Sequence, residues 1–200
     1  MMTQFFVTGT CTGVGKTSYS VDWIRSWRAK GVNGVGVKPF ATGDRSDAVR
    51  LQEAMEGVLS LDEINPCCFA SAMAPLMAAQ KEGGGIPYDL ILKHTVSLAE
   101  QFTHLVVEGA GGWMVPLTED KMICDFAKEL GFPVVIVARA GLGTINQSLL
   151  TVKAVHRQGL GIHEIVLNRF PEDSEELSNL NRDYLARRTG VPVRLTKFMQ

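Results

Sequence analysis

Short runs rich in β-branched and aromatic residues alternate with longer helical patterns along almost the whole chain. The run Pro133–Ala138 is entirely apolar, which is typical of a parallel strand buried on both faces. Because strands that alternate with helices pair in parallel through right-handed crossovers, few other arrangements are open to such a chain. We therefore predict a three-layer α/β fold in which a mostly parallel sheet is flanked by helices.

The local patterns also predict where the elements lie. We expect strands at Gln4–Thr8, Gly34–Lys38, His104–Glu108, Pro133–Ala138, His163–Asn168 and Val191–Leu195. We expect helices at Lys16–Lys30, Asp47–Glu56, Asp89–Gln101, Met122–Leu130, Thr144–Gln158 and Ser174–Arg188. No internal repeat or linker divides the 200 residues, so we expect a single domain over residues 1–200.

Charge and composition exclude several classes of protein. The chain has 20 Lys and Arg against 21 Asp and Glu, so it has no basic excess for nucleic acid or anionic lipid. The longest uncharged stretch, Ile64–Gln80, contains two prolines and is no membrane span. The N-terminus lacks the pattern of a signal peptide, and the four cysteines form no C-x-x-C pair. We expect a cytoplasmic protein with free thiols.

A glycine-rich segment follows the first expected strand and opens the first expected helix. Gly15, Lys16 and Thr17 form the GK[ST] core of a P-loop, in which backbone N–H groups cradle phosphates. Lys16 would reach the β- and γ-phosphates, and the Thr17 hydroxyl would ligate Mg²⁺. The spacing is a variant, since the usual position of the first glycine is Thr10 and the glycine is Gly9. The segment predicts a nucleoside triphosphate site.

Charged residues at two further strand ends would face the same site. Lys38 ends the second expected strand and would offset the charge of a transferring phosphoryl group. Glu108 ends an apolar strand in the manner of a Walker-B carboxylate. With Thr17 and Asp47 it would supply hard oxygen ligands for Mg²⁺. Taken singly, Lys38 also fits a solvated strand end and Asp47 an ordinary N-terminal helix residue.

Glycines follow two of the strand ends. Gly109, Gly111 and Gly112 would let a substrate approach the backbone closely. Gly141 and Gly143 precede a helix N-terminus, which favours an anion. On the residues alone, ordinary loop-to-helix capping explains this last segment.

Four segments in this order resemble the dethiobiotin synthetase family, ATP-dependent ligases of biotin biosynthesis. They are FFVTGTCTGVGKT, KPFATG followed by SDAVRLQ, VVEGAGGWMVPL, and GLGTINQSLLT, and the segment NPCCFASAMAPLMAAQ is also similar. The resemblance covers Gln4 to about Asn168 and implies a P-loop NTPase-like fold. It implies that 7,8-diaminopelargonic acid captures CO₂ as a carbamate. The carbamate then attacks the γ-phosphate of ATP to give a carbamic–phosphoric anhydride, which closes to dethiobiotin, leaving ADP and phosphate.

The resemblance also implies roles for particular residues. Nucleotide would lie against Thr12, Gly13, Val14, Gly15, Lys16, Thr17, Ser18, Asp47, Glu108, Gly109, Ala110, Gly111, Asn168 and Arg169. Substrate would lie against Lys38, Thr42, Gly111, Gly143, Thr144, Ile145 and Asn146. The last four would bind the substrate carboxylate across the interface of a homodimer. Lys38 and Lys16 would be catalytic, and Thr17, Asp47 and Glu108 would hold Mg²⁺.

The chain departs from the family at two places. Cys11 stands where many members have an acidic residue, which predicts altered tuning of the phosphate loop. Family chains usually continue past the last strand into a Pro-containing loop, whereas this chain stops at Gln200, so we expect an open base pocket. Two alternatives stay open: another P-loop amide ligase of the cobyrinic acid diamide synthetase type, and a nucleotide-binding regulator without catalysis.

Overall fold

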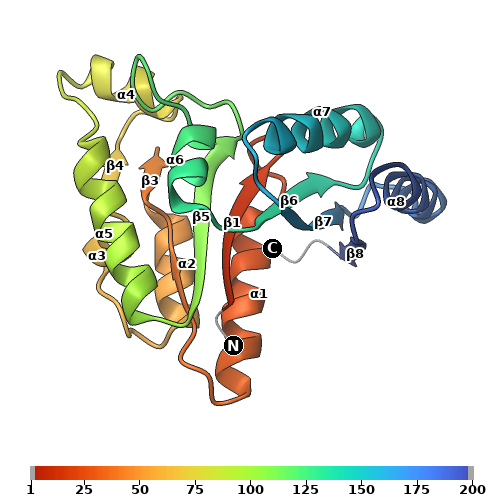
Figure 1. Cartoon of the computed structure of the whole chain (residues 1–200), viewed down its shortest axis with the longest axis horizontal. Coiled ribbons are helices and arrows are strands. Elements are labelled where there is room, and N and C mark those ends of the chain that lie inside the picture. The colour runs from red at the N-terminus through yellow and green to blue at the C-terminus, as the bar shows by residue number, and fades with distance from the viewer. Residues whose placement is uncertain (1–2, 198–200) are drawn as a thin grey trace.

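The computed structural model describes residues 3–197 and contains a six-stranded sheet between helices (Figure 1). The sheet consists of β1 (Thr3–Gly9), β2 (Val35–Val37), β5 (His104–Gly112), β6 (Val134–Arg139), β7 (Ile162–Arg169) and β8 (Val193–Lys197). The strands lie in the order β2-β5-β1-β6-β7-β8, and every neighbouring pair is parallel. The predicted mostly parallel α/β fold is confirmed.

Helices connect the strands and cover the sheet on both faces (Figure 1). They are α1 (Lys16–Ala29), α2 (Ser46–Ala54), α3 (Leu61–Ile64), α4 (Pro75–Lys81), α5 (Tyr88–Gln101), α6 (Ile123–Leu130), α7 (Thr144–Arg157) and α8 (Glu175–Thr189). The six helices expected from the sequence are all present, with ends that differ by one or two residues. Among the described residues, no helix is both long and apolar enough to cross a membrane.

The two faces of the sheet build two separate clusters of buried side chains. Successive side chains of a strand point to opposite faces, so neighbours in β1 enter different clusters. Phe5 and Val7 pack with Tyr19 and Trp27 of α1. Phe6 belongs to the larger cluster, which includes side chains of α5 and α6. Burial on both faces explains why the strands are so apolar in sequence.

Four short elements were not expected from the sequence. The strands β3 (Phe40–Thr42) and β4 (Cys67–Phe69) form a small parallel sheet of their own, and α3 and α4 flank β4 in the chain. Each element is too short to show a periodic pattern, so tertiary contacts decide its conformation. The β3 strand contacts α4, and together they cover one side of the site described below.

The strand that carries Glu108 is longer than expected. We predicted a strand at His104–Glu108, but β5 continues to Gly112 because Gly112 still pairs with Gly9 of β1. The pairing register between the strands β1 and β5 shifts between Val7 and Gly9 of β1, an irregularity of the β-bulge kind. Glu108 therefore lies inside a strand, completely buried, and not at a strand end.

Candidate active site

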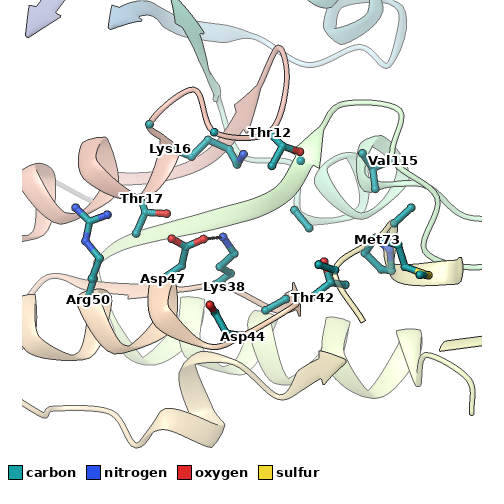
Figure 2. A pocket seen from close by; sticks show the side chains of 18 of the residues that line it. Thr12, Lys16, Thr17, Lys38, Thr42, Asp44, Asp47, Arg50, Met73 and Val115 are labelled. Atoms are coloured by element: carbon teal, nitrogen blue, oxygen red, sulfur yellow. Dashed lines mark hydrogen bonds and ion pairs between the residues drawn. The ribbon is translucent and has the colours of Figure 1, made fainter. Parts of the chain in front are cut away.

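A cavity of about 550 Å³ lies where the segments after β1 and β2 meet the end of β5 (Figure 2). Its lining consists of Thr12, Gly13, Gly15, Lys16, Thr17, Ser18, Lys38, Ala41, Thr42, Asp44, Asp47, Arg50, Ala72, Met73, Ala74, Pro75, Ala110, Gly111 and Val115. Ligands of parallel α/β sheets bind outside the carboxyl ends of the strands, and this cavity has that position.

The phosphate loop has the backbone that an anion cradle needs. Gly13 and Gly15 have φ values of 76° and 95°, a left-handed conformation that other residues rarely adopt. Gly15 caps α1, so the first free N–H groups of the helix face the cavity side of the loop. A Cβ atom on Gly9 would lie 2.6 Å from the Cys11 carbonyl oxygen and 3.1 Å from that of Gly111. Gly9, which lies one residue before the usual first position of the motif, must therefore be glycine because the backbone packs closely around it.

Lys38 joins two carboxylates beside the phosphate loop. Its Nζ donates to Asp47 Oδ2 (Figure 2). The same Nζ donates to Glu108 Oε1 at 2.9 Å. The Thr17 hydroxyl donates to the same Glu108 Oε1 at 2.7 Å. The three residues proposed for the metal are thus joined to one another through these contacts and Lys38, although they come from α1, α2 and β5.

Burial and the neighbouring charges shift the pKa of Lys38, Asp47 and Lys16. Burial alone would lower the pKa of Lys38, but Glu108 and Asp47 outweigh it and raise that pKa. Burial opposes ionisation of Asp47 in the same way, yet Lys38 holds its pKa below the ordinary value. Burial lowers the pKa of Lys16, which Glu108 only partly offsets and Lys38 reinforces. Lys16 is therefore the cation of the site that an incoming anion would stabilise most.

The donor set around Glu108 suits a hard divalent cation. Glu108 Oε2 is buried and has no hydrogen-bond partner among residues 3–197. A buried carboxylate oxygen without a partner is costly, and a cation bound there would satisfy it. Within that described range, no group of three or more His, Cys, Asp or Glu side chains is arranged to hold a metal by itself. A cation here would therefore need oxygens from phosphate and water beside Thr17, Asp47 and Glu108.

Most of the residues predicted for the site line this one cavity. They are Thr12, Gly13, Gly15, Lys16, Thr17, Ser18, Lys38, Thr42, Asp47, Ala110 and Gly111. Val14, Glu108 and Gly109 do not line it. Val14 is buried, and a Cβ on Gly109 would lie 3.2 Å from the ring of Phe6. Glu108 is completely buried behind the lining residues Thr17 and Lys38, which it contacts.

The residues predicted for the base and for the substrate carboxylate lie elsewhere. Asn168 is buried at the end of β7, where Nδ2 donates to the Val14 carbonyl at 2.7 Å and Oδ1 accepts from Thr196. Arg169 forms an ion pair with Glu175 at 2.6 Å. Gly143, with a φ of 89°, caps α7, and Thr144–Asn146 form the first turn of that helix. None of these residues lines the cavity in this chain.

Sequence reasoning did not single out several lining residues. Arg50 lies one turn after Asp47 on α2, so helical spacing alone would have placed it on the same face. Ala72–Pro75 and Val115 form an apolar side of the cavity. Asp44 accepts from the backbone N–H and hydroxyl of Ser46 and begins the turn into α2.

Comparison with known proteins places the chain within one group. A family model described as an AAA domain matches residues 3–195. The chain is 45% identical over 192 residues to the ATP-dependent dethiobiotin synthetase BioD of Anaeromyxobacter dehalogenans (strain 2CP-C), covering 94% of this chain and 86% of that protein. It is 37% identical over 198 residues to the same-named protein of Bacillus subtilis (strain 168), covering 96% and 85%.

Among solved structures, the chain is similar in fold to the cell division protein FtsY of Thermotoga maritima. The TM-score is 0.52 at 15% sequence identity, over 100% of this chain and 63% of that one. At this level of identity, the similarity concerns the fold alone.

Proposed function

Because the chain belongs to the dethiobiotin synthetase family, we propose that it is the ATP-dependent ligase that makes dethiobiotin from 7,8-diaminopelargonic acid and CO₂. The observation that carries the proposal is that Lys38, which lines the cavity with Asp47 and the phosphate loop, contacts both Asp47 and the buried Glu108. ADP and phosphate are the other products.

Three bond-forming steps account for the reaction. One amine of the substrate attacks the carbon of CO₂ and loses a proton, which gives a carbamate. A carbamate oxygen then attacks the γ-phosphorus of ATP, and ADP leaves. The second amine attacks the carbamoyl carbon, phosphate leaves and the cyclic urea closes.

Each step brings anions together, so the main tasks of the protein are positioning and charge stabilisation. Lys16 and the N–H groups of Gly13 and Gly15 would hold the terminal phosphates. Lys38 would lie between the carbamate and the γ-phosphate. Because the carboxylates raise its pKa, Lys38 stays cationic through the reaction. No proton transfer from Lys38 is needed for that role.

We propose Mg²⁺ as the divalent ion, held by Thr17, Asp47 and Glu108 together with phosphate and water. The unpartnered Glu108 Oε2 supports this assignment. When bound, the ion would neutralise phosphate charge and orient the polyphosphate.

The remaining contacts are proposed from the family. Asn168 and Arg169, beyond the phosphate loop, would lie on the base side of the nucleotide. In a homodimer, Gly143–Asn146 of one copy would bind the carboxylate of the substrate that lies in the site of the other copy. We further propose that the 200 residues act as a single ligase domain in the cytoplasm.

The test is phosphate release from MgATP and bicarbonate, with and without 7,8-diaminopelargonic acid, and detection of dethiobiotin by mass. We expect diamine-dependent phosphate release with one cyclic urea formed per phosphate. Lys38→Ala should abolish this turnover and keep MgADP binding within a few-fold, because Lys38 acts on the transferring group. Nucleotide binding without any diamine dependence would overturn the proposed substrate and favour an amide ligase or a regulator.

A further inference from the structure

Arg50 is a cation of the cavity that neither the P-loop motif nor the family resemblance assigns. It lies on α2 and lines the cavity together with Thr17 and Ser18 of α1. In Figure 2 it stands at the end of the cavity opposite Met73 and Val115, and its side chain points from α2 toward α1. One guanidinium nitrogen, Nη2, donates to the Ser18 hydroxyl at 3.2 Å.

The charge of Arg50 is not neutralised in the way that the charge of Lys38 is. Lys38 contacts two carboxylates, whereas no ion pair joins Arg50 to a carboxylate within the described part of the chain. Asp22 on α1 interacts with Arg50 electrostatically: Arg25, Arg194 and Arg50 each act to lower its pKa, although burial raises it overall. Arg50 therefore lines the cavity with a hydroxyl, and not a carboxylate, as its hydrogen-bond partner among the described residues.

The order of residues along the phosphate loop indicates which phosphate Arg50 faces. Lys16 reaches the β- and γ-phosphates in a P-loop, and Thr17 reaches the metal between them. The backbone N–H groups of the same loop cradle the α- and β-phosphates. Ser18 follows Thr17 in the chain, and the contact of Arg50 is with Ser18. In the view of Figure 2, Asp47 and Lys38 lie between Arg50 and the end of the cavity at Thr42.

We propose that Arg50 binds the α-phosphate side of the nucleotide, exchanging its Ser18 contact for a charge-assisted hydrogen bond to a non-bridging oxygen. The proposal rests on the proposed ATP site and extends it to a residue on α2. Arg50 would be a nucleotide-binding residue and would not act on the transferring phosphoryl group.

Such a role predicts a particular pattern of effects. A contact made equally in the ground state and the transition state changes affinity and leaves the turnover number unaltered. Loss of one charge-assisted hydrogen bond to phosphate weakens binding by about tenfold. Binding of MgADP and the KM for ATP should therefore change together, while kcat stays within about twofold.

The experiment measures MgADP binding by titration calorimetry for the wild type, Arg50→Met and Arg50→Lys. The control is Arg25→Met, which removes another arginine near Asp22 from the exposed side of α1 and does not touch the cavity. We expect about tenfold weaker binding for Arg50→Met, an intermediate loss for Arg50→Lys and no change for Arg25→Met. Thermal unfolding of each variant is measured alongside.

Three results would overturn the proposal. Unchanged MgADP affinity with a lowered melting temperature would make Arg50 a structural link between α1 and α2. Unchanged MgADP affinity with a lowered kcat would place Arg50 at the γ-phosphate. Absence of MgADP and MgATP binding by the wild type would instead remove the proposed ATP site, and the role of Arg50 with it. Because MgADP binding needs no diamine, a wrong carbon substrate would leave this test intact.

Discussion

Two buried glutamates lie on strands of the same sheet, and their surroundings differ. Glu164, near the start of β7, accepts from the Tyr19 hydroxyl at 2.8 Å and from two nitrogens of Arg194 at 3.2 Å. Both of its oxygens are occupied. Glu108 in β5 is more deeply buried, yet Thr17 and Lys38 share one of its oxygens and the other has no partner.

The difference separates a carboxylate that holds the fold together from one kept for a ligand. Native proteins satisfy nearly all buried polar atoms, so an exception calls for an explanation. Glu164 links α1 to β7 and β8 and needs nothing further. Glu108 lies next to the cavity that the phosphate loop lines, and a cation bound there would give its second oxygen a partner. Replacing each glutamate with glutamine should therefore lower turnover at position 108 and lower the stability of the fold at position 164.

Glu108→Gln should give the largest effect. The amide cannot replace the carboxylate as a metal ligand or as the counter-ion of Lys38, so we expect turnover to fall by about 10³-fold, or about 4 kcal/mol of barrier. The free energy of unfolding should change by less than about 1 kcal/mol, since the side chain keeps its shape and the acceptor for Thr17. Steady-state kinetics and denaturant unfolding measure the two quantities. Full activity in this variant would contradict the assignment of Glu108 to ligand binding.

Glu164→Gln should have its effect on stability instead. The variant loses the charge-assisted bonds from Arg194, whose side chain is partly exposed, so we expect a loss of about 1–2 kcal/mol of unfolding free energy. Turnover should stay within about twofold of the wild type when measured well below the melting temperature. A loss of turnover without a loss of stability would contradict the structural role given to Glu164.

The pH dependence of stability tests a third carboxylate, Asp47, against the two glutamates. Lys38 holds the pKa of Asp47 below its ordinary value, although burial acts in the other direction. A carboxylate with a lowered folded pKa adds stability above its unfolded pKa and loses it as pH falls through the folded pKa. The stability difference between wild type and Asp47→Asn should therefore persist at neutral pH and vanish in strong acid. We expect it to be less than about 1 kcal/mol, because the Asp47 side chain is 39% exposed although Lys38 is buried.

Unfolding curves recorded from pH 7 down to acid would measure this difference, with Lys38→Met as the control. Removing the lysine should raise the pKa of Asp47, because burial is then less opposed, so the stability that ionised Asp47 adds at neutral pH should shrink in this variant. A stability difference that grows as pH falls would show that the lysine does not control Asp47.

The smallest effect concerns the thiols. Cys11 is exposed on the phosphate loop, whereas Cys67 and Cys124 are buried, and burial raises the pKa of Cys67 to about 11 and also raises that of Cys124. We expect a thiol reagent to modify Cys11 first and MgADP to slow that modification severalfold. Mass spectrometry of the modified peptides measures the order. Equal labelling with and without nucleotide would place the ligand away from the loop.

The sequence predicted the large features of the fold because they leave patterns in it. Strands buried on both faces are continuously apolar, and the phosphate loop needs glycine at fixed positions. The strands β3 and β4, of three residues each, leave no such pattern, and neither does the continuation of β5 through Gly109–Gly112.

The candidate site was predicted in its residues but not in its contacts. Lys38, Asp47 and Glu108 were chosen for their residue type and position, yet no spacing reveals that the lysine contacts both carboxylates. Arg50 has a sequence signal, since it lies three residues after Asp47 on the same helix. Glu164 has no such signal, since a single glutamate in a strand looks the same whether it faces solvent or the tyrosine and arginine that it contacts here.

The strand order of the sheet has a consequence for how the chain is made. The neighbours of β1 are β5 and β6, which begin at His104 and Val134. A growing chain on the ribosome therefore carries its phosphate loop for about half of its synthesis with no strand on either side of β1. Nucleotide cannot assist the early stages of folding, and chains released before β6 would be left with an open sheet edge, the kind of surface that promotes aggregation.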